Sequence, residues 1–273
     1  MAMPFNRGLL MPSLPQLRHS AGRSLRSDRE KEILIGLRRL VPLYRRTAGR
    51  IVHRLFHLDL IEKTDNFFNV RWLGMPVWQN VLDLWVIQET ISEVRPALLI
   101  ECGTNRGGSA LFYAHLFDLM DHGRVITIDV ERMHHLDHPR IEFIEGNSTE
   151  TATVERVRSA ADQIDGPVMV ILDSDHSESH VAAELEAYSP FVTVGSLLHV
   201  QDGVIDQLTV FCLDRPGPLP AIKSFLARHP EFRWERERSE RFLITHHPMG
   251  WLRRIESSKN AVASPKTSRF TAS

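Results

Sequence analysis

The sequence predicts an α/β protein built on a doubly wound sheet of seven strands. Short apolar runs that read as strands alternate with helix-like stretches in units of about 30 residues, which is typical of parallel sheets. The expected parallel strands are residues 97–102, 124–130, 141–145, 168–173 and 196–201. The expected helices are residues 80–93, 108–121, 150–163, 178–188 and 218–229. This order places helices on both faces of the sheet.

The last part of the chain breaks this alternation. Two strand-like runs, 232–237 and 241–247, are separated by only three residues, Ser-Glu-Arg. A link this short predicts an antiparallel hairpin, because parallel neighbours need a crossover of a dozen or more residues. A parallel sheet that ends in an antiparallel pair is the arrangement of the class I methyltransferase fold.

The chain of 273 residues divides into four expected segments. Residues 1–28 are rich in Arg, Ser and Pro without periodicity, which predicts a disordered basic tail. Residues 29–68 carry apolar side chains at helical spacing and predict a helical arm, residues 69–254 form the α/β domain, and residues 255–273 form a second disordered tail. The arm would pack on its own domain or on a second subunit of a homo-oligomer. Contact with an anionic membrane surface is the less favoured interpretation.

Charge is distributed unevenly along the chain. The net charge is -1, yet residues 1–54 carry +9 and residues 252–273 carry +4, which leaves -14 for the body between them. Nucleic-acid binding requires a basic face, so the acidic body argues against such a partner. An acidic body suits a site in which carboxylates surround a cation.

The composition, with 42% hydrophobic and 25% charged residues, is that of an ordinary globular protein. No apolar run approaches the ~18 residues that span a bilayer. The first residues lack the apolar stretch and cleavage site of a secretory signal. Cys102 and Cys212 form neither a disulfide framework nor a zinc-binding spacing, so we expect a reducing, cytoplasmic location.

A glycine-rich turn follows the first expected strand, with the sequence ECGTNRGGS. It places an acid and two glycines in the pattern acid-x-Gly-x-x-x-Gly, at Glu101, Gly103 and Gly107. A P-loop would contain Gly-Lys-Ser/Thr, and a dinucleotide loop would have glycine in place of Asn105. The pattern resembles the loop that binds S-adenosylmethionine, a cationic ligand without phosphate. A purely structural strand-to-helix turn is the alternative.

Polar residues also end the next two strands. Asp129 ends the run RVITIDV, where an acid typically accepts hydrogen bonds from ribose hydroxyls. Asn147 and Ser148 follow the third strand, where an adenine ring would lie, although Gly-Asn-Ser is also common in turns. Three successive strand ends therefore predict a nucleoside-binding edge of the sheet.

Oxygen-bearing side chains end the fourth and fifth strands. Asp173 ends the run VMVILD. Gln201 ends the run SLLHVQ, and Asp202 follows it directly. Mg²⁺ prefers oxygen ligands, and a metal can lower the pKa of a substrate hydroxyl and hold it in place. His176, three residues after Asp173, lies where a general base would take the proton. These residues predict a magnesium site with an adjacent base.

A different metal site is also compatible with this segment. His176 and His180 lie four residues apart and, with Asp173, could bind iron or zinc. The protein would then be a non-haem iron oxygenase. We favour this interpretation less, because the sequence offers no further nitrogen or sulfur ligand. His180 is expected to be a surface residue of its helix.

Long stretches of the chain resemble a known family. WLGMPVWQNVLDLWVIQETISEVRPALLIECGTNRGGSALFYA, VMVILDSDHSESHVAAELEAYSPFVTVGS and ERFLITHHPMGWLRR are closely similar to the cephalosporin hydroxylase/rhamnosyl O-methyltransferase family. The resemblance covers residues 69–254 and implies a methyltransferase domain that depends on S-adenosylmethionine and Mg²⁺. It also implies methylation of a hydroxyl on a sugar, glycolipid or other natural-product scaffold, by a protein that is often oligomeric.

The resemblance also assigns roles to residues. Around the cofactor it places Glu101, Gly103, Thr104, Gly107, Ser109, Asp129, Ser148 and Asp173. It makes Asp173 and Asp202 metal ligands and His176 the general base. Where the family usually has Glu-Asp after the fifth strand, this chain has Gln201-Asp202. An amide oxygen can still coordinate a metal, but one negative charge is lost, so we expect weaker Mg²⁺ binding. A non-catalytic, cofactor-binding partner is the remaining alternative.

Overall fold

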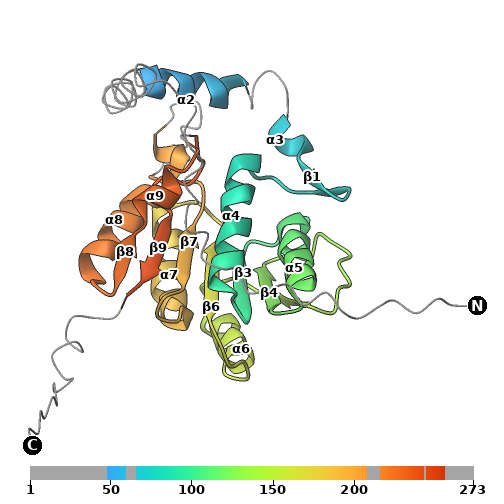
Figure 1. Ribbon diagram of the computed structural model, residues 1–273. Coiled ribbons are helices and arrows are strands. Elements are labelled where there is room, and N and C mark those ends of the chain that lie inside the picture. The colour runs from blue at the N-terminus through green and yellow to red at the C-terminus, as the bar shows by residue number, and fades with distance from the viewer. Residues whose placement is uncertain (1–47, 60–65, 208–215, 243, 256–273) are drawn as a thin grey trace, which may run out of the picture. The chain divides into compact units, whose positions relative to one another are not determined.

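The computed structural model describes residues 48–59, 66–207, 216–242 and 244–255. Within these residues a seven-stranded sheet has the order β5-β4-β3-β6-β7-β9-β8 (Figure 1). Its strands are β3 (Leu98–Cys102), β4 (Arg124–Asp129), β5 (Ile141–Glu145), β6 (Val168–Leu172), β7 (Leu197–Val200), β8 (Phe232–Trp234) and β9 (Trp251–Arg254). The pairs from β5 to β7 are parallel, whereas β9 is antiparallel to both β7 and β8. The predicted sheet and its antiparallel end are confirmed.

The position of the last strand differs from the prediction. The expected hairpin between 232–237 and 241–247 is wrong: β8 is followed by a short helix, α9 (Arg236–Ser239), and β8 pairs with β9. The physical reason lies in distant hydrogen bonds of the predicted strand. Thr245 Oγ1 donates to Asp83 Oδ1 at 2.6 Å, and the His246 N–H donates to Asp83 Oδ2 at 2.8 Å. These groups therefore bond to a helix instead of a strand ladder.

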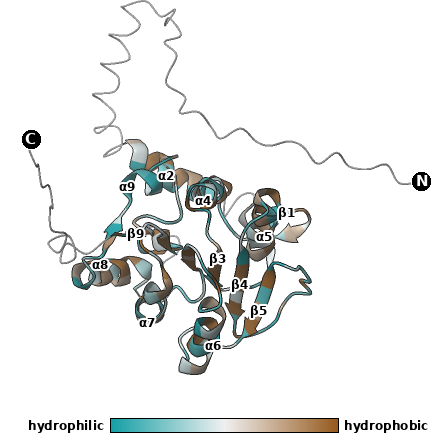
Figure 2. Cartoon of the chain, turned by 60° about the horizontal axis from the view of Figure 1, so that its bottom comes forward, coloured by the Kyte–Doolittle hydropathy of each residue, from teal (hydrophilic) through white to brown (hydrophobic). Residues whose placement is uncertain are grey.

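The helices cover both faces of the sheet. They are α4 (Val81–Val94), α5 (Gly108–Met120), α6 (Thr151–Ala161), α7 (Glu178–Tyr188) and α8 (Pro218–Arg228). Leu98 and Ile100 of β3 pack with α6, α7 and α8, while Leu99 packs with α4 and α5 on the other face. Every residue of β3 is buried, as expected for a strand covered on both sides. In Figure 2 the central strands are largely brown, which marks this apolar interior.

Smaller elements complete the described part of the chain. They are α2 (Ala48–Leu58), α3 (Asn66–Asn69), β1 (Arg71–Trp72), β2 (Met75–Pro76), η2 (Ser189–Phe191) and η3 (Gly203–Asp206). Strands β1 and β2, which the sequence did not predict, pair with each other in antiparallel fashion. The sheet and its helices belong to the compact unit Ile51–Ser273, and of the unit Met1–Arg50 only residues 48–50 are described.

Several predictions concern residues outside the described ranges. The predicted tail 1–28, all but the first residue of the tail 255–273, and Cys212 lie outside them. The predicted arm 29–68 is described only at 48–59 and 66–68, where it is mostly helical. The homo-oligomer and the membrane contact of the arm stay predictions. Among the described helices, none has the length and apolar character needed to cross a bilayer.

Candidate active site

Two adjoining cavities among the described residues lie at the carboxyl ends of the parallel strands, the usual ligand-binding edge of such sheets. The first has a volume of about 280 Å³ and the second of about 420 Å³. Their shared walls are formed by Gly103, Asn105, Asp173 and Ser174. The two cavities therefore adjoin along the turns that follow β3 and β6.

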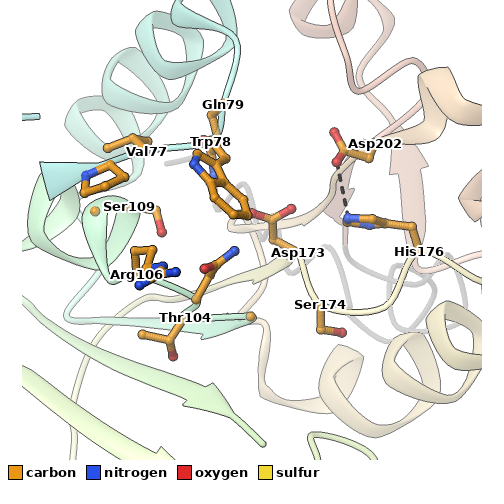
Figure 3. A pocket seen from close by; sticks show the side chains of 14 residues that line it. Val77, Trp78, Gln79, Thr104, Arg106, Ser109, Asp173, Ser174, His176 and Asp202 are labelled. Carbon is orange, nitrogen blue, oxygen red and sulfur yellow. Dashed lines mark hydrogen bonds and ion pairs between the residues drawn. The ribbon is translucent and has the colours of Figure 1, made fainter. Parts of the chain in front are cut away.

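The predicted site residues are distributed over these cavities. The first cavity is lined by Gly103, Thr104, Ser109, Asp173, His176 and Asp202 (Figure 3). The second is lined by Gly103, Asp129, Ser148 and Asp173. The cavity walls do not include Glu101, Gly107 or Gln201. The structure thus brings the three predicted groups, the loop, the nucleoside edge and the carboxylates, to one edge of the sheet.

Glu101 is a fully buried carboxyl at the end of β3. Burial raises its pKa to about 7, although the hydroxyls of Ser109 and Thr127 oppose the shift. Thr127 Oγ1 donates to Oε2 at 2.6 Å and shares a further hydrogen bond with Thr104 Oγ1 at 2.6 Å. Oε1 is buried and has no hydrogen-bond partner within the described residues. A buried acceptor without a partner is costly, so this oxygen is suited to a positively charged or hydrogen-donating ligand group.

The loop after β3 requires glycine at two positions. Gly103 has a φ of 99°, and a Cβ built there would lie 2.1 Å from the backbone oxygen of Asp173. Gly107 has a φ of 81°, and its Cβ would meet the side chain of Leu136 at 2.3 Å. Both backbones occupy the left-handed region that favours glycine. Gly103 therefore allows the β3 turn to contact the β6 turn that carries Asp173, and Gly107 allows it to contact Leu136.

We expect Gly103→Ala to destabilise the protein by about 2–5 kcal/mol, because it combines backbone strain with a steric clash. Gly74→Ala is the matched control: its φ is 90°, but a Cβ there meets nothing within 4 Å. Gly74→Ala should lose only about 1 kcal/mol of folding stability, because it introduces backbone strain without a clash. Chemical denaturation of both variants measures the difference, and equal losses of stability would contradict the steric explanation.

The second cavity carries the residues predicted for a nucleoside. Asp129 Oδ2 accepts a hydrogen bond from the Asn105 backbone N–H at 2.8 Å, which ties the β4 end to the β3 loop. Ser148 Oγ donates to Glu184 Oε1 at 2.5 Å and lies 3.1 Å from His180 Nε2. The Ser148 hydroxyl is therefore held by a buried acid of α7, and its contact with an adenine ring stays a prediction.

The first cavity brings together two acids and a histidine. Ligand atoms of Asp173, His176 and Asp202 all lie within 4.8 Å of one another, and His176 Nε2 is 3.2 Å from Asp202 Oδ2 (Figure 3). Burial and the charge of Asp202 raise the pKa of Asp173 well above its usual range. Burial also raises the pKa of Asp202. A divalent cation would relieve this repulsion, so the donor set fits a metal ion with oxygen preference.

Gln201 lies behind this group with 1% of its surface exposed. With its amide nitrogen toward Asp173, it donates to the two carboxylate oxygens at 3.1 and 3.3 Å. Its amide oxygen then accepts from Gln79 Nε2 at 3.1 Å. Gln79 Nε2 also lies 3.2 Å from Asp173 Oδ2. Gln201 therefore contacts Asp173 directly in this arrangement, and its predicted role as a metal ligand stays untested.

His180 was expected at the surface, but it is half-buried and lies 3.3 Å from Glu184 Oε1. The metal-compatible group of the first cavity is Asp173, His176 and Asp202, without His180. The arrangement therefore does not support the alternative iron site built on His176, His180 and Asp173.

A second group of possible ligands, His115, Asp118 and His138, is occupied by hydrogen bonds. Trp72 Nε1 donates to His115 Nδ1 at 2.9 Å, and Arg140 Nε donates to Asp118 Oδ1 at 2.7 Å. His138 Nδ1 accepts from the Arg140 backbone N–H at 3.2 Å, which leaves Nε2 as a donor to Asp118 Oδ2 at 3.0 Å. With their lone pairs used in this way, the rings support the fold and are poor metal ligands.

Three features of the site were missed in the sequence. Trp78 and Gln79, ahead of α4, line the first cavity. Glu184, a fully buried acid of α7, accepts from Ser148 and from Ser174 Oγ at 2.6 Å. His247, close to β9, accepts the Asp202 backbone N–H. Only Glu184 left a signal in the sequence, since it occupies a position on the apolar face of its helix.

Comparison with known proteins identifies the family of the chain. The family model described as Rhamnosyl O-methyltransferase/CmcI matches residues 65–255. The rhamnosyl O-methyltransferase of Mycobacterium tuberculosis (strain H37Rv) is 32% identical over 235 residues, covering 80% of this chain and 93% of that protein. The protein of the same name from Mycobacterium leprae is 34% identical over 189 residues, covering 66% and 81%.

Solved structures of CmcI share the fold. An apo-structure of CmcI has a TM-score of 0.56 at 19% identity, covering 70% of this chain and 78% of that one. A CmcI structure with Mg and SAM has a TM-score of 0.55 at 18% identity and the same coverage. The family match spans most of the chain, and the identity to the mycobacterial proteins exceeds 30%. The chain therefore belongs to the Rhamnosyl O-methyltransferase/CmcI family.

Proposed function

We propose that this chain, which its family makes an S-adenosylmethionine-dependent O-methyltransferase, methylates a sugar hydroxyl with the help of a divalent cation such as Mg²⁺. One observation carries the proposal: Asp173 lines both cavities, while Asp202 and His176 line only the first. A nucleoside in the second cavity would therefore place a group attached to it beside the acid–histidine group. The volumes of about 280 and 420 Å³ suit a donor and an acceptor side by side.

The residues of the two cavities fit the donor. Asp129 at the end of β4 would accept hydrogen bonds from ribose hydroxyls. Glu101 lines neither cavity, and its unpartnered Oε1 would accept from the ammonium of an amino-acid portion that reaches past Gly103. The bare backbone at Gly103 allows the turns after β3 and β6 to approach each other closely, and both cavities share this wall. A relative with the same fold, CmcI, has been solved with Mg and SAM.

The first cavity supplies the groups for methyl transfer. Asp173 and Asp202 would hold a divalent cation, which when bound lowers the pKa of the acceptor hydroxyl. The His176 ring takes the hydroxyl proton as the oxygen–methyl bond forms and the sulfur–methyl bond breaks. Asp202 Oδ2, which lies 3.2 Å from His176 Nε2, stabilises the imidazolium that results. The walls around Asp173 hold donor and acceptor in line, an effect worth up to ~7–11 kcal/mol in favourable cases.

Two observations support a sugar as the acceptor. The mycobacterial relatives are named rhamnosyl O-methyltransferases. Trp78, with 40% of its surface exposed, lines the first cavity and offers a flat aromatic face beside Asp173. A flat apolar ring combined with a polar edge suits the two faces of a hexose.

Isothermal titration with S-adenosylhomocysteine tests the proposed cofactor. We expect heat of binding from the full chain and a matching increase in thermal stability. Methyl transfer to rhamnosyl acceptors, followed by mass spectrometry with and without a chelator, tests acceptor class and metal dependence. Absence of binding at high protein concentration would reject the proposal.

We expect Gln201→Glu to tighten Mg²⁺ binding by about tenfold, because it adds a charge beside Asp173. The same change should lower the stability of the metal-free protein, since the new carboxylate replaces an amide donor to Asp173. Gln163→Glu, at an exposed position, is the matched control for charge alone. Metal titration of both variants is the measurement. An unchanged affinity in Gln201→Glu would show that Gln201 is not a metal ligand.

A further inference from the structure

A row of buried side chains connects Asp202 to helix α4. The Asp202 backbone N–H donates to His247 Nδ1 at 2.9 Å. On the other side of the ring, His247 Nε2 lies 3.7 Å from Asp83 Oδ2 in the first turn of α4. His247 is 1% exposed and Asp83 is 2% exposed. The row therefore runs through the interior, from the helix to the turn after β7.

The hydrogen bond to Asp202 determines the state of the His247 ring. Because Nδ1 accepts an N–H, the ring proton must reside on Nε2, which faces the carboxylate of Asp83. The distance of 3.7 Å to Asp83 is an electrostatic contact, too long for a hydrogen bond.

Asp83 is held firmly by its own partners. It accepts hydrogen bonds from Asn80 Nδ2 at 3.1 Å, from Thr245 Oγ1 at 2.6 Å and from the His246 N–H at 2.8 Å. These bonds tie the segment that carries His247 to the start of α4. A buried acid with several donors is rigid, so the ring of His247 has a fixed support.

Asp202 needs such a support because its backbone is unusual. Its φ is 55° and its ψ 25°, in the left-handed region that costs a non-glycine residue of order 1–3 kcal/mol. The conformation directs Oδ2 toward His176 at 3.2 Å and keeps the carboxylate within ligand distance of Asp173. Without a partner for its N–H, the turn would relax and the carboxylate would move.

We propose that His247 is a positioning residue for methyl transfer, which with Asp83 locks the backbone of Asp202 so that its carboxylate faces Asp173 and His176. This inference rests on the proposed function of the first cavity. His247, in the segment before β9, lines neither cavity and is not a proposed metal ligand, so its role would be to position Asp202. A small displacement of a positioned group can lower a rate by 10²-fold or so, so the lock is expected to matter for catalysis.

Two polar substitutions separate positioning from simple packing. His247→Asn keeps an acceptor near the place of Nδ1, whereas His247→Gln moves the acceptor toward the place of Nε2. We expect the affinity for Mn²⁺ or Mg²⁺, measured by titration calorimetry, to stay within twofold in His247→Asn and to fall about tenfold in His247→Gln. kcat should fall with the metal affinity, while the affinity for S-adenosylhomocysteine should stay within twofold in both variants.

His134→Gln is the matched control, since His134 is also buried and its Nδ1 also accepts a backbone N–H, that of Leu136 at 3.2 Å rather than that of Asp202. It should lose thermal stability without a change in metal affinity. Equal metal affinities in His247→Asn and His247→Gln, or an equal loss in His134→Gln, would overturn the inference. Wild-type protein that binds neither S-adenosylhomocysteine nor metal would instead reject the proposed function.

A variant that does not require a change of the His247 side chain provides a second test. Asp83→Asn keeps an oxygen for the Thr245 or His246 donor and removes the charge that faces Nε2. We expect it to weaken metal binding about threefold and to leave the affinity for S-adenosylhomocysteine unchanged. If His247→Gln fails to fold, the metal affinity of Asp83→Asn tests the inference instead. An unchanged metal affinity in Asp83→Asn would overturn it.

Discussion

His176→Ala is expected to lower kcat by about 10²–10⁴-fold, the usual effect of removing a general base. The affinity for S-adenosylhomocysteine should change little, because His176 does not line the second cavity. Steady-state methyl-transfer rates combined with calorimetric titration measure both quantities. The expected pattern is a loss in kcat with an almost unchanged donor affinity.

The metal affinity of His176→Ala distinguishes a base from a ligand. Metal affinity should stay within threefold or so, as Asp173 and Asp202 would remain. His135→Ala, at an exposed histidine, is the control. Loss of metal binding in His176→Ala would make His176 a ligand and leave the proton acceptor to be found elsewhere.

Glu101→Gln is expected to act in opposite directions on stability and on donor binding. The variant should weaken binding of S-adenosylhomocysteine by about 10–100-fold, because a charge-assisted hydrogen bond of about 1.5–3 kcal/mol is lost. The ligand-free variant should be more stable than the wild type at pH 8. A variant that stabilises the fold while it weakens ligand binding indicates a buried acid that serves binding rather than stability.

The stability difference has a defined pH dependence. The pKa of Glu101 is raised from 4.5 to about 7 in the folded protein, so its neutral form is favoured there. Its contribution to stability is therefore complete below pH 4.5 and is lost as the pH rises through 7, whereas glutamine does not ionise. The two proteins should differ little at pH 4.5 and by up to about 3 kcal/mol at pH 8. Parallel curves from urea unfolding at several pH values would contradict this.

Much of the site could be predicted because it depends on where strands end. Parallel strands present their carboxyl ends at one edge, so Asp129, Asp173 and Asp202 could be brought together from chain order alone. The bounds of β5 and α7 agree with prediction, since Gly146 follows the first and Ser177 precedes the second. The glycine pattern likewise predicted a turn after the first parallel strand, and in the structure Gly103 and Gly107 of this turn have positive φ.

The parts that could not be predicted depend on contacts between distant residues. The run RFLITHH alternates like a strand, but Thr245 and His246 bond to Asp83, which lies more than 160 residues earlier. Gln79 reaches Asp173 across 94 positions of the sequence. Local periodicity carries no information on such partners. The supporting residues and the wall residues Trp78 and Gln79 were therefore hidden, whereas the acids and glycines at the strand ends were visible.

The placement of β9 between β7 and β8 has a consequence for synthesis on the ribosome. β8 is made first but pairs only with β9 in the sheet, so it has no neighbouring strand until β9 has emerged. His247 emerges just ahead of β9, and the turn that carries Asp202 lacks its anchor until then. A nascent chain halted after α9 would already contain every proposed metal ligand and the base. It would lack His247, and so it could not hold Asp202 in position beside Asp173 and His176.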